Sequence, residues 1–249
     1  MPNHVTNWVH VEGPEEEVQE FLRKVQNDEY GLGSIDFEKI IPMPASLKIE
    51  SGSKTDRGLK EYKAFVEVYQ LGHESASKED LLHIPHTSEA AFLAMRKDIT
   101  HEVWALGRTA FQNQLKYGSP TWYEWSIKNW GTKWNAYGYG SQPHKDNSIF
   151  MLTAWSAPHG ILVALASQNP SLTFTHKWAD EDIGQNCGEN VYKNGTLRET
   201  YYPEYGREAV EYAAEIMDAD PSEWGLVLNS DGTDYIYAPE NETEGMDLG

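Results

Sequence analysis

Two separate stretches of the chain follow the order strand, helix, strand, and this order restricts the fold more than any other feature of the sequence. The first stretch opens at Asn3–Val11, where valine or asparagine occupies every second position, as in a strand with one buried face. Gly13 and Pro14 end that strand, and a helix through about Gln26 follows. A short extended run over residues 35–41 completes the stretch.

The second stretch lies in the other half of the chain. Ser148–Trp155 has a continuous apolar middle, as expected for a strand that is covered on both faces. Pro158–Ser167 has the spacing of an amphipathic helix, and Leu172–Trp178 alternates as another strand. Two such stretches in one sheet make the split βαβ plan, a four-stranded antiparallel sheet with two helices on one face. The sequence therefore predicts a fold of the α+β class.

Residues 48–118 separate the two stretches, and we expect them to form a mostly helical insertion. Lys48–Lys60 is polar and is predicted to be an exposed excursion, while the residues after it have helical spacing. Ser77 and Asp80 resemble a capping box, and Gly118 is typical of a helix end. The predicted division is residues 1–47 with 119–183 as one domain, 48–118 as the insertion, and 184–249 as a C-terminal segment packed on the core.

The C-terminal segment is predicted to contain a turn at residues 193–195, a helix over Arg207–Met217, and a hairpin. The arms of that hairpin are expected at Gly225–Asn229 and Thr233–Ala238, around a Ser-Asp-Gly turn. This part of the chain is also where most of its negative charge lies, so it is predicted to be an acidic extension of the domain.

The whole chain carries a formal charge of −19, which is unevenly distributed. From Asp180 to Gly249 there are eighteen Asp and Glu against three Lys and Arg, a balance of −15, while the preceding residues have a balance of only −4. Such a field repels nucleic-acid backbones and attracts basic partners. The alternatives are a solvated surface that promotes solubility, a surface that mimics DNA, or one that docks a basic host protein.

The single cysteine, Cys187, excludes an internal disulfide and a four-thiolate iron–sulfur cluster. The opening residues MPNHVTNWVH include no basic stretch followed by an apolar run, so we expect no signal peptide. No stretch of the sequence has the length and apolarity of a membrane span. These features predict a cytosolic protein with no membrane association.

The segment Asn129–Tyr137, NWGTKWNAY, gathers aromatic rings around a lysine. Rings of this kind can stack on bases, while a lysine meets a phosphate and asparagine reads polar edges. This pattern predicts a site for a nucleotide-like ligand. The candidate ligand-binding residues are Trp130, Lys133, Trp134, Asn135, Tyr137 and Tyr139.

A second interpretation of the same segment is structural, because tryptophans are commoner in cores than on ligand platforms. In that case Gly131 and Thr132 form a turn or bulge that bends a strand. The tryptophans that would then pack between sheet and helices are Trp122, Trp125, Trp130 and Trp155.

Other candidate chemistries are weaker. His83 and His86 are spaced as two ligands on one helical face, but Pro85 between them disrupts that helix, so no metal site is predicted. Cys187 lies among acidic residues, which raise a thiol pKa and argue against a nucleophile. The acidic run that begins at Asp180 is expected to form a turn closed at Gly184. We assign no catalytic residue and expect no cofactor.

The chain also resembles a known family. Segments that carry the resemblance are MPNHVTN at the start, IDF…IIPMP over residues 35–44, NWGTKWN from Asn129, TAWSAP from Thr153 and ADEDIG from Ala179. Together they resemble the YubB-type (Api92-like) family of phage, prophage and plasmid proteins. The resemblance implies a ferredoxin-like domain interrupted by a helical one. It supplies no established activity and no catalytic residues.

These observations favour a non-enzymatic accessory protein of a mobile element. We expect it to counter a host defence, either by sequestering a nucleotide-like molecule or by occluding a defence protein. One alternative is a small nucleotide-processing enzyme that uses Lys133, His144, His159 and the acidic loop. Another is an acidic DNA mimic or protein-interaction module. Direct binding of nucleic acid is not expected.

Overall fold

The computed structural model describes residues 3–141 and 145–238 of the chain. It consists of two compact units, which are considered separately. Residues 1–40 and 134–249 make up the sheet unit, and residues 41–133 make up the helical unit. The predicted insertion, residues 48–118, lies within the helical unit.

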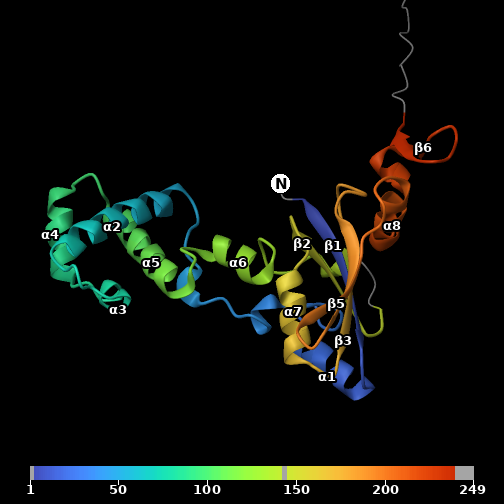
Figure 1. Cartoon of the computed structure of the whole chain (residues 1–249), viewed down its shortest axis with the longest axis horizontal. Helices are drawn as coiled ribbons and strands as arrows, with labels where there is room; N and C mark the ends of the chain where they lie inside the picture. The colour runs from blue at the N-terminus through green and yellow to red at the C-terminus, as the bar shows by residue number, and fades with distance from the viewer. Residues whose placement is uncertain (1–2, 142–144, 239–249) are drawn as a thin grey trace, which may run out of the picture. The chain divides into compact units, whose positions relative to one another are not determined.

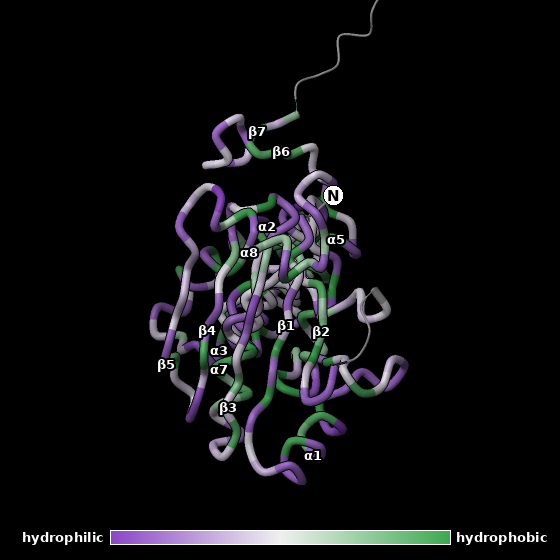
Figure 2. The backbone as a smooth tube through the Cα atoms, turned by 90° about the vertical axis from the view of Figure 1, so that its right-hand side faces the viewer, coloured by the Kyte–Doolittle hydropathy of each residue, from purple (hydrophilic) through white to green (hydrophobic). Residues whose placement is uncertain are grey.

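The sheet unit contains a five-stranded antiparallel sheet with the strand order β2-β1-β3-β4-β5, which can be followed in Figure 2. Its strands are β1 (His4–Glu12), β2 (Ser148–Ala154), β3 (Thr173–Asp180), β4 (Cys187–Lys193) and β5 (Thr196–Tyr201). On β1, Val9 lies opposite Ile149 of β2 on one side and His176 of β3 on the other. Because β1 is antiparallel to both neighbours, β2 and β3 run parallel with β1 between them, as the split βαβ plan requires.

The strand predicted over residues 35–41 is absent, and this part of the prediction was wrong. Phe37–Lys39 forms a single 3₁₀ turn, because the side chain of Asp36 accepts a hydrogen bond from the backbone N–H of Glu38. The edge of β2 is instead bonded by two short segments of backbone. Gly33 O accepts from Phe150 N at 2.9 Å, and Tyr137 pairs with Leu152.

Beyond β3 the sheet continues with the hairpin of β4 and β5, of which the sequence predicted only the turn at residues 193–195. Asn194 and Gly195 both have positive φ angles, 52° and 69°, and join β4 to β5. Asn-Gly tolerates this backbone geometry, which matches the twist of paired strands. The sheet therefore gains β4 and β5 beside β3, in place of the strand predicted over residues 35–41.

Helices cover both faces of the sheet (Figure 1). On one face lie α1 (Glu15–Val25) and α7 (His159–Gln168), with Phe21 of α1 packed 5.2 Å from Phe174 of β3. On the other lies α8 (Arg207–Met217), the helix that the sequence predicts. Trp8 of β1 donates its indole N–H to Ile216 O of α8 at 3.2 Å. The alternation of β1 thus sends valines to one helical layer and Trp8 to the other.

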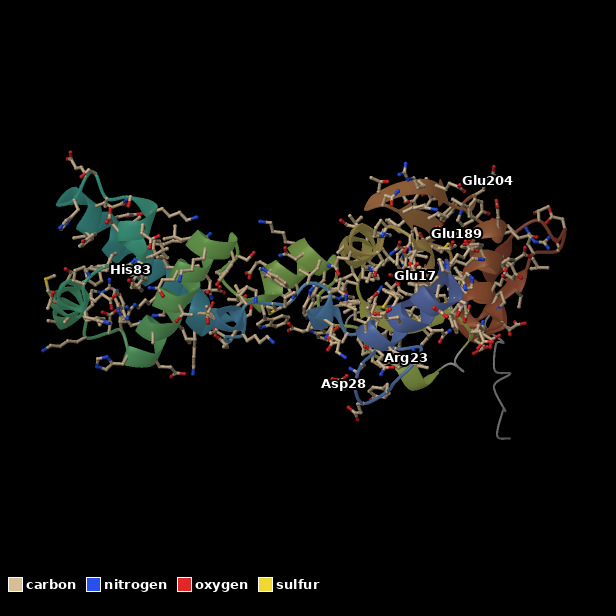
Figure 3. The ribbon with its side chains drawn as sticks, turned by 90° about the horizontal axis from the view of Figure 1, so that it is seen from below. Glu17, Arg23, Asp28, His83, Glu189 and Glu204 are labelled. Atoms are coloured by element: carbon tan, nitrogen blue, oxygen red, sulfur yellow. The ribbon has the colours of Figure 1, made fainter. Side chains whose placement is uncertain are left out.

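Two further features of the sheet unit follow from local sequence. The acidic first turn and basic last turn of α1 suit its helix dipole, and Figure 3 labels Glu17 and Arg23 from these turns. Beyond α8, the 3₁₀ helix η4 (Pro221–Trp224) leads into the small hairpin β6 (Leu226–Leu228) and β7 (Tyr235–Tyr237).

The helical unit contains α2 (Ser53–Leu71), α3 (Lys78–Leu82), α4 (His86–Met95), α5 (His101–Tyr117) and α6 (Trp122–Trp130). The capping box of Ser77 and Asp80 is confirmed at the start of α3, and Gly118 ends α5 with a φ of 74°. Most of Lys48–Lys60 is exposed, as predicted, but the segment is not a loop throughout, because helix α2 begins inside it at Ser53. Gly58 is buried where α2 crosses α5. A Cβ on Gly58 would lie only 2.2 Å from Val103 O.

The core of the helical unit holds a buried carboxylate. Glu89 is 5% exposed and accepts from the hydroxyl of Tyr62 at 3.0 Å and from the indole N–H of Trp104 at 3.3 Å. The guanidinium Nε of Arg108 lies 3.3 Å from Oε1 of Glu89, the oxygen that also accepts from Tyr62. A buried charge is tolerated only when it is paired and hydrogen-bonded in this way. Glu89 therefore ties α2, α4 and α5 together.

A second buried polar group lies in the sheet, beneath α7. His176 is fully buried, and its Nε2 lies 3.0 Å from Asn7 Oδ1, so this nitrogen donates the hydrogen. Its Nδ1 has no partner among the described residues. His159 Nδ1 lies 3.0 Å from the hydroxyl of Tyr192, and the two imidazole rings are 5.7 Å apart. Burial, with a smaller contribution from His159, holds the pKa of His176 well below its usual value, and burial also lowers the pKa of His159.

We predict that Glu89→Ala destabilises the helical unit by about 3 kcal/mol, because the buried hydroxyl of Tyr62 and indole N–H of Trp104 lose their acceptor. Calorimetric unfolding would measure this loss. Glu79→Ala, which removes an exposed glutamate of α3, is the matched control and should leave the transition nearly unchanged. Equal effects of the two substitutions would show that Glu89 has no special role.

The buried histidines predict a pH dependence of stability. Below about pH 6.5 the unfolded chain binds protons on these imidazoles, while the folded chain does not, so stability is lost as the pH falls toward the lower folded pKa values. We expect a loss of up to about 1.4 kcal/mol per pH unit for each histidine. Chemical denaturation between pH 7 and 5 would measure it, and His176→Gln should flatten the slope. An unchanged slope in that variant would contradict the assignment.

Candidate functional site

The sheet unit contains a pocket of about 210 Å³ with an aromatic lining, here called the aromatic–lysine pocket. It lies on the face of the sheet from which Trp8 projects. The lining includes a lysine and no Asp or Glu. Its residues are Trp8, Tyr30, Leu32, Gly33, Ser34, Tyr139, Gly140, Lys145, Ser148 and Phe150.

Two neighbouring strands form the wall of the pocket. Trp8 of β1 and Phe150 of β2 are direct cross-strand partners, with ring centroids 4.9 Å apart in an edge-to-face arrangement. Such pairs are favoured by the ring quadrupoles. The hydrogen bond from the Trp8 indole to Ile216 O fixes the ring further. This wall of the site is therefore built on rigid elements of the sheet, while other lining residues lie in loops.

The positive charge comes from the turn that precedes β2. The Nζ atom of Lys145 lies 4.2 Å from the centroid of the Trp8 ring, a cation–π contact. Lys145 O accepts from the backbone N–H of Ser148 at 3.1 Å, which ties the lysine to the start of the strand. The side chain of Lys145 is exposed, so its charge stays accessible to a ligand.

Two tyrosines form the opposite side of the pocket, with ring centroids 5.1 Å apart. Tyr30 belongs to the loop after α1, whose glycines Gly31 and Gly33 have φ angles of 74° and 89° that other residues rarely adopt. Tyr139 is anchored more firmly. Its hydroxyl donates to Ala136 O at 2.8 Å and also contacts Ile35 O closely. Burial, followed by the charge of Asp36, raises the pKa of Tyr139 well above its usual value, so the ring stays neutral.

One pair at this pocket has the elements of nucleophilic chemistry. The hydroxyl of Ser148 lies 3.1 Å from Nδ1 of His10, and the two residues face each other across β1 and β2. A serine beside an imidazole is the first requirement for an activated nucleophile. His10 is exposed, and Ser148 Oγ also lies 3.3 Å from Asp146 O.

Trp130 and Lys133, both predicted as ligand-binding, lie in the helical unit. Trp130 is 3% exposed, donates its indole N–H to Ile41 O at 2.9 Å and packs against Trp125. Gly131 has a φ of 84° and ends helix α6, so the predicted strand bulge at this position was wrong. Lys133 Nζ lies 5.8 Å from the ring centroid of Tyr123. Trp125 and Trp130 are therefore buried, as the structural interpretation requires, but they lie in the helical unit and not between sheet and helices. Trp155 is 43% exposed, so its predicted packing in the core was wrong.

The other predicted residues belong to the sheet unit, and they divide between structural and exposed positions. Asn135 accepts from the backbone N–H of Phe37 at 2.9 Å and donates to Asp36 at 2.7 Å, so it fixes the loop after α1. Tyr137 OH lies 2.7 Å from Nδ1 of His4, and burial, with the charge of Glu181, raises its pKa to about 12. Trp134 is 37% exposed. Of the six predicted residues, only Tyr139 lines the aromatic–lysine pocket, and ligand binding by the others stays a prediction.

Most residues that line the pocket were not predicted from the sequence. Trp8 occupies an outward position in the alternation of the first strand, and this was a usable signal, because a tryptophan there needs a partner. Tyr30 and Lys145 stand in loops, and nothing in their sequence neighbourhood indicates that they meet. Both line the pocket beside the paired strands β1 and β2, which lie far apart in the sequence.

The remaining expectations concern cysteine, metals and membranes. Cys187 is buried, and its pKa is raised, as predicted, although the cause is burial and not the acidic neighbours. His83 follows α3 and His86 begins α4, on either side of Pro85. In the described part of the chain, no three His, Cys, Asp or Glu residues are grouped so as to hold a metal ion. Of the helices in residues 3–141 and 145–238, none combines the length and apolarity needed to cross a bilayer.

Comparison with known proteins identifies one region of the chain. Residues 130–220 match the family model described as the ferredoxin-like domain in Api92-like protein. The chain carries the ferredoxin-like domain of Api92-like proteins. This Api92-type domain includes strands β2 to β5 with helices α7 and α8, and the resemblance to the family is confirmed over these residues.

A solved structure is also similar, that of a protein api92 from Yersinia pseudotuberculosis. It shares 13% sequence identity and a TM-score of 0.35, with 82% of this chain and 99% of that chain covered. At this identity and score the likeness carries no argument about fold or function. No curated protein matches the chain.

We predict that Tyr139→Phe destabilises the sheet unit by about 1–2 kcal/mol, because it removes the hydroxyl from two backbone carbonyls. The free energy of unfolding in urea would measure this. Tyr30→Phe, which alters the exposed tyrosine across the same pocket, should have no comparable effect. If Tyr30→Phe destabilises as much as Tyr139→Phe, the anchoring role of the Tyr139 hydroxyl is contradicted.

Proposed function

We propose that the sheet unit is a non-enzymatic binding domain that holds a planar, anionic small molecule of the nucleotide type in the aromatic–lysine pocket. The observation that carries the proposal is the ammonium group of Lys145, 4.2 Å from the Trp8 ring, beside the tyrosines of the opposite wall. Aromatic faces stack on bases, and a lysine beside them meets a phosphate.

The charge of the lining supports an anionic ligand. The chain as a whole has a net charge of −19, yet the residues of this pocket include one lysine and no carboxylate. A cationic ligand would be repelled by Lys145, which already lies over the Trp8 ring, whereas a phosphate would gain an ion pair next to low-dielectric aromatic walls. One wall of the pocket is also built on rigid strands, and the pocket is formed without a ligand, as small-molecule sites usually are.

A second candidate function is a small nucleotide-processing enzyme, favoured by the pair of Ser148 and His10 at the same pocket. The enzyme suggested by the sequence used a different set of residues. Lys133 of that set lies in the helical unit, and His144 lies outside the described residues. His159 is bonded to the hydroxyl of Tyr192.

The biological setting of the proposal rests on the resemblance to proteins of phages and plasmids. In this setting the Api92-type domain would withhold a nucleotide-like molecule from a host defence system, in the cytoplasm of the host. The helical unit would be an insertion in the sheet unit, and residues 184–249 would be the acidic C-terminal part of the sheet unit. Occlusion of a basic defence protein is the alternative that this acidic part supports.

Titration calorimetry with AMP, GMP and the matching nucleosides tests the proposal. We expect the nucleotides to bind more tightly than the nucleosides, because only they meet Lys145. Lys145→Ala should weaken nucleotide binding by about tenfold, the value of one charged contact, and leave nucleoside binding nearly unchanged. Lys24→Ala, which removes an exposed lysine of α1, is the matched control.

Whether the nucleotide is recovered intact or converted distinguishes a binding protein from an enzyme. Under the proposal, chromatography returns the nucleotide intact after long incubation. Turnover that is abolished by Ser148→Ala would support the enzyme instead. Equal binding of nucleosides and nucleotides, or equal loss in the two lysine variants, would contradict an anion site at Lys145.

A further inference from the structure

The sheet unit contains a second pocket, whose chemistry is opposite to that of the first. It also measures about 210 Å³ and is here called the tyrosine–aspartate pocket. Aromatic rings and two carboxylates stand out in its lining, and no lysine or arginine belongs to it. Its residues are Asp182, Ile183, Gly184, Gln185, Tyr205, Gly206, Val210, Trp224, Leu226, Asp234, Tyr235 and Tyr237.

Three segments from the end of the chain meet to form this pocket: the turn after β3, the start of α8, and the hairpin β6–β7. Two contacts hold them together. Trp224 donates its indole N–H to Glu181 O at 2.9 Å, which links η4 to the turn. Gly184 has a φ of 80° and lies against Val210 of α8, where a Cβ would come within 2.9 Å of the valine side chain. The rings are therefore presented from fixed backbone.

The two carboxylates of the pocket lack a cation. In the part of the chain that the structure describes, neither Asp182 nor Asp234 forms an ion pair, although Asp234 Oδ1 accepts from the N–H of Tyr235 at 2.8 Å. The arginine next to the pocket, Arg207, is engaged elsewhere. Its guanidinium pairs with Glu211 at 2.7 Å and donates to Gly232 O at 2.6 Å.

The surroundings add to this negative field. The segment Asp180–Gly249 has a balance of −15, and its acidic residues include Glu189 and Glu204, labelled in Figure 3. A field of this sign draws basic partners toward the surface. The rings then offer their negative faces to a cation that arrives, and a carboxylate can pair with it.

We propose that the tyrosine–aspartate pocket receives the side chain of a lysine or arginine from a basic partner protein. The aromatic rings contact the aliphatic stem and the charged head, and Asp182 and Asp234 pair with that head. The acidic field steers the partner, while the pocket selects one side chain. This differs from a uniformly solvated acidic surface, because the rings and the two carboxylates act together at one place.

The test uses NMR spectroscopy of the full chain with N-acetyl-lysine methylamide as the probe. We expect saturable shifts of the Trp224 indole N–H and of the backbone signals of Gly184 and Gly206. N-acetyl-arginine methylamide should give the same pattern. N-acetyl-norleucine methylamide has the apolar stem without the charge, so it should bind far more weakly.

Matched variants separate the pocket from the general field. Asp234→Asn keeps an oxygen that accepts from Tyr235 and should weaken lysine binding by about fivefold, as Asp182→Asn should also. Glu215→Gln removes one charge from the exposed side of α8 and should have little effect. Equal weakening by Glu215→Gln, equal binding of norleucine, or shifts elsewhere would overturn the proposal. Nucleotide binding in the other pocket is a separate measurement, so each proposal can fail alone.

Discussion

The sheet unit depends on the pairing of β1 as its central strand. The two partners of β1 are strands from the second half of the chain, and each contacts it over almost its full length. Because side chains alternate along a strand, this one pairing places Val5, Asn7, Val9 and Val11 under α1 and α7 and sends Trp8 toward α8. A shift of β1 by one residue would bury the polar face and remove Trp8 from the aromatic–lysine pocket.

The sheet unit has two pockets of opposite character. Near the start of β2, Lys145 and the rings around Trp8 form a site without carboxylates. Beyond the end of β3, the turn at Asp182 meets α8 and the last hairpin to form a site without lysine or arginine. An anionic small molecule and a basic protein would thus bind at different places, and neither would compete for the residues of the other.

The sequence predicted local structure well where the signal was local. Helix α8, the capping box at Ser77 and the order of strands and helices around α7 follow from spacing and caps. It misjudged residues 35–41, where the side chain of Asp36 closes a 3₁₀ turn that competes with the strand. The candidate site was harder to predict, because neighbours in the sequence belong to different units. Trp130 and Lys133 belong to the helical unit, whereas the exposed Trp134 belongs to the sheet unit. Lys145 meets Trp8 only through pairing of distant strands, which no local pattern reveals.

The measurement that tests the central claim most directly is native mass spectrometry of the chain purified gently from cells in which a defence system is active. The account predicts an additional mass of a nucleotide-like molecule, released on denaturation and absent from the Lys145→Ala variant. A clean mass for the unmodified chain, or the same bound molecule in the Lys145→Ala variant, would contradict the aromatic–lysine pocket as its site.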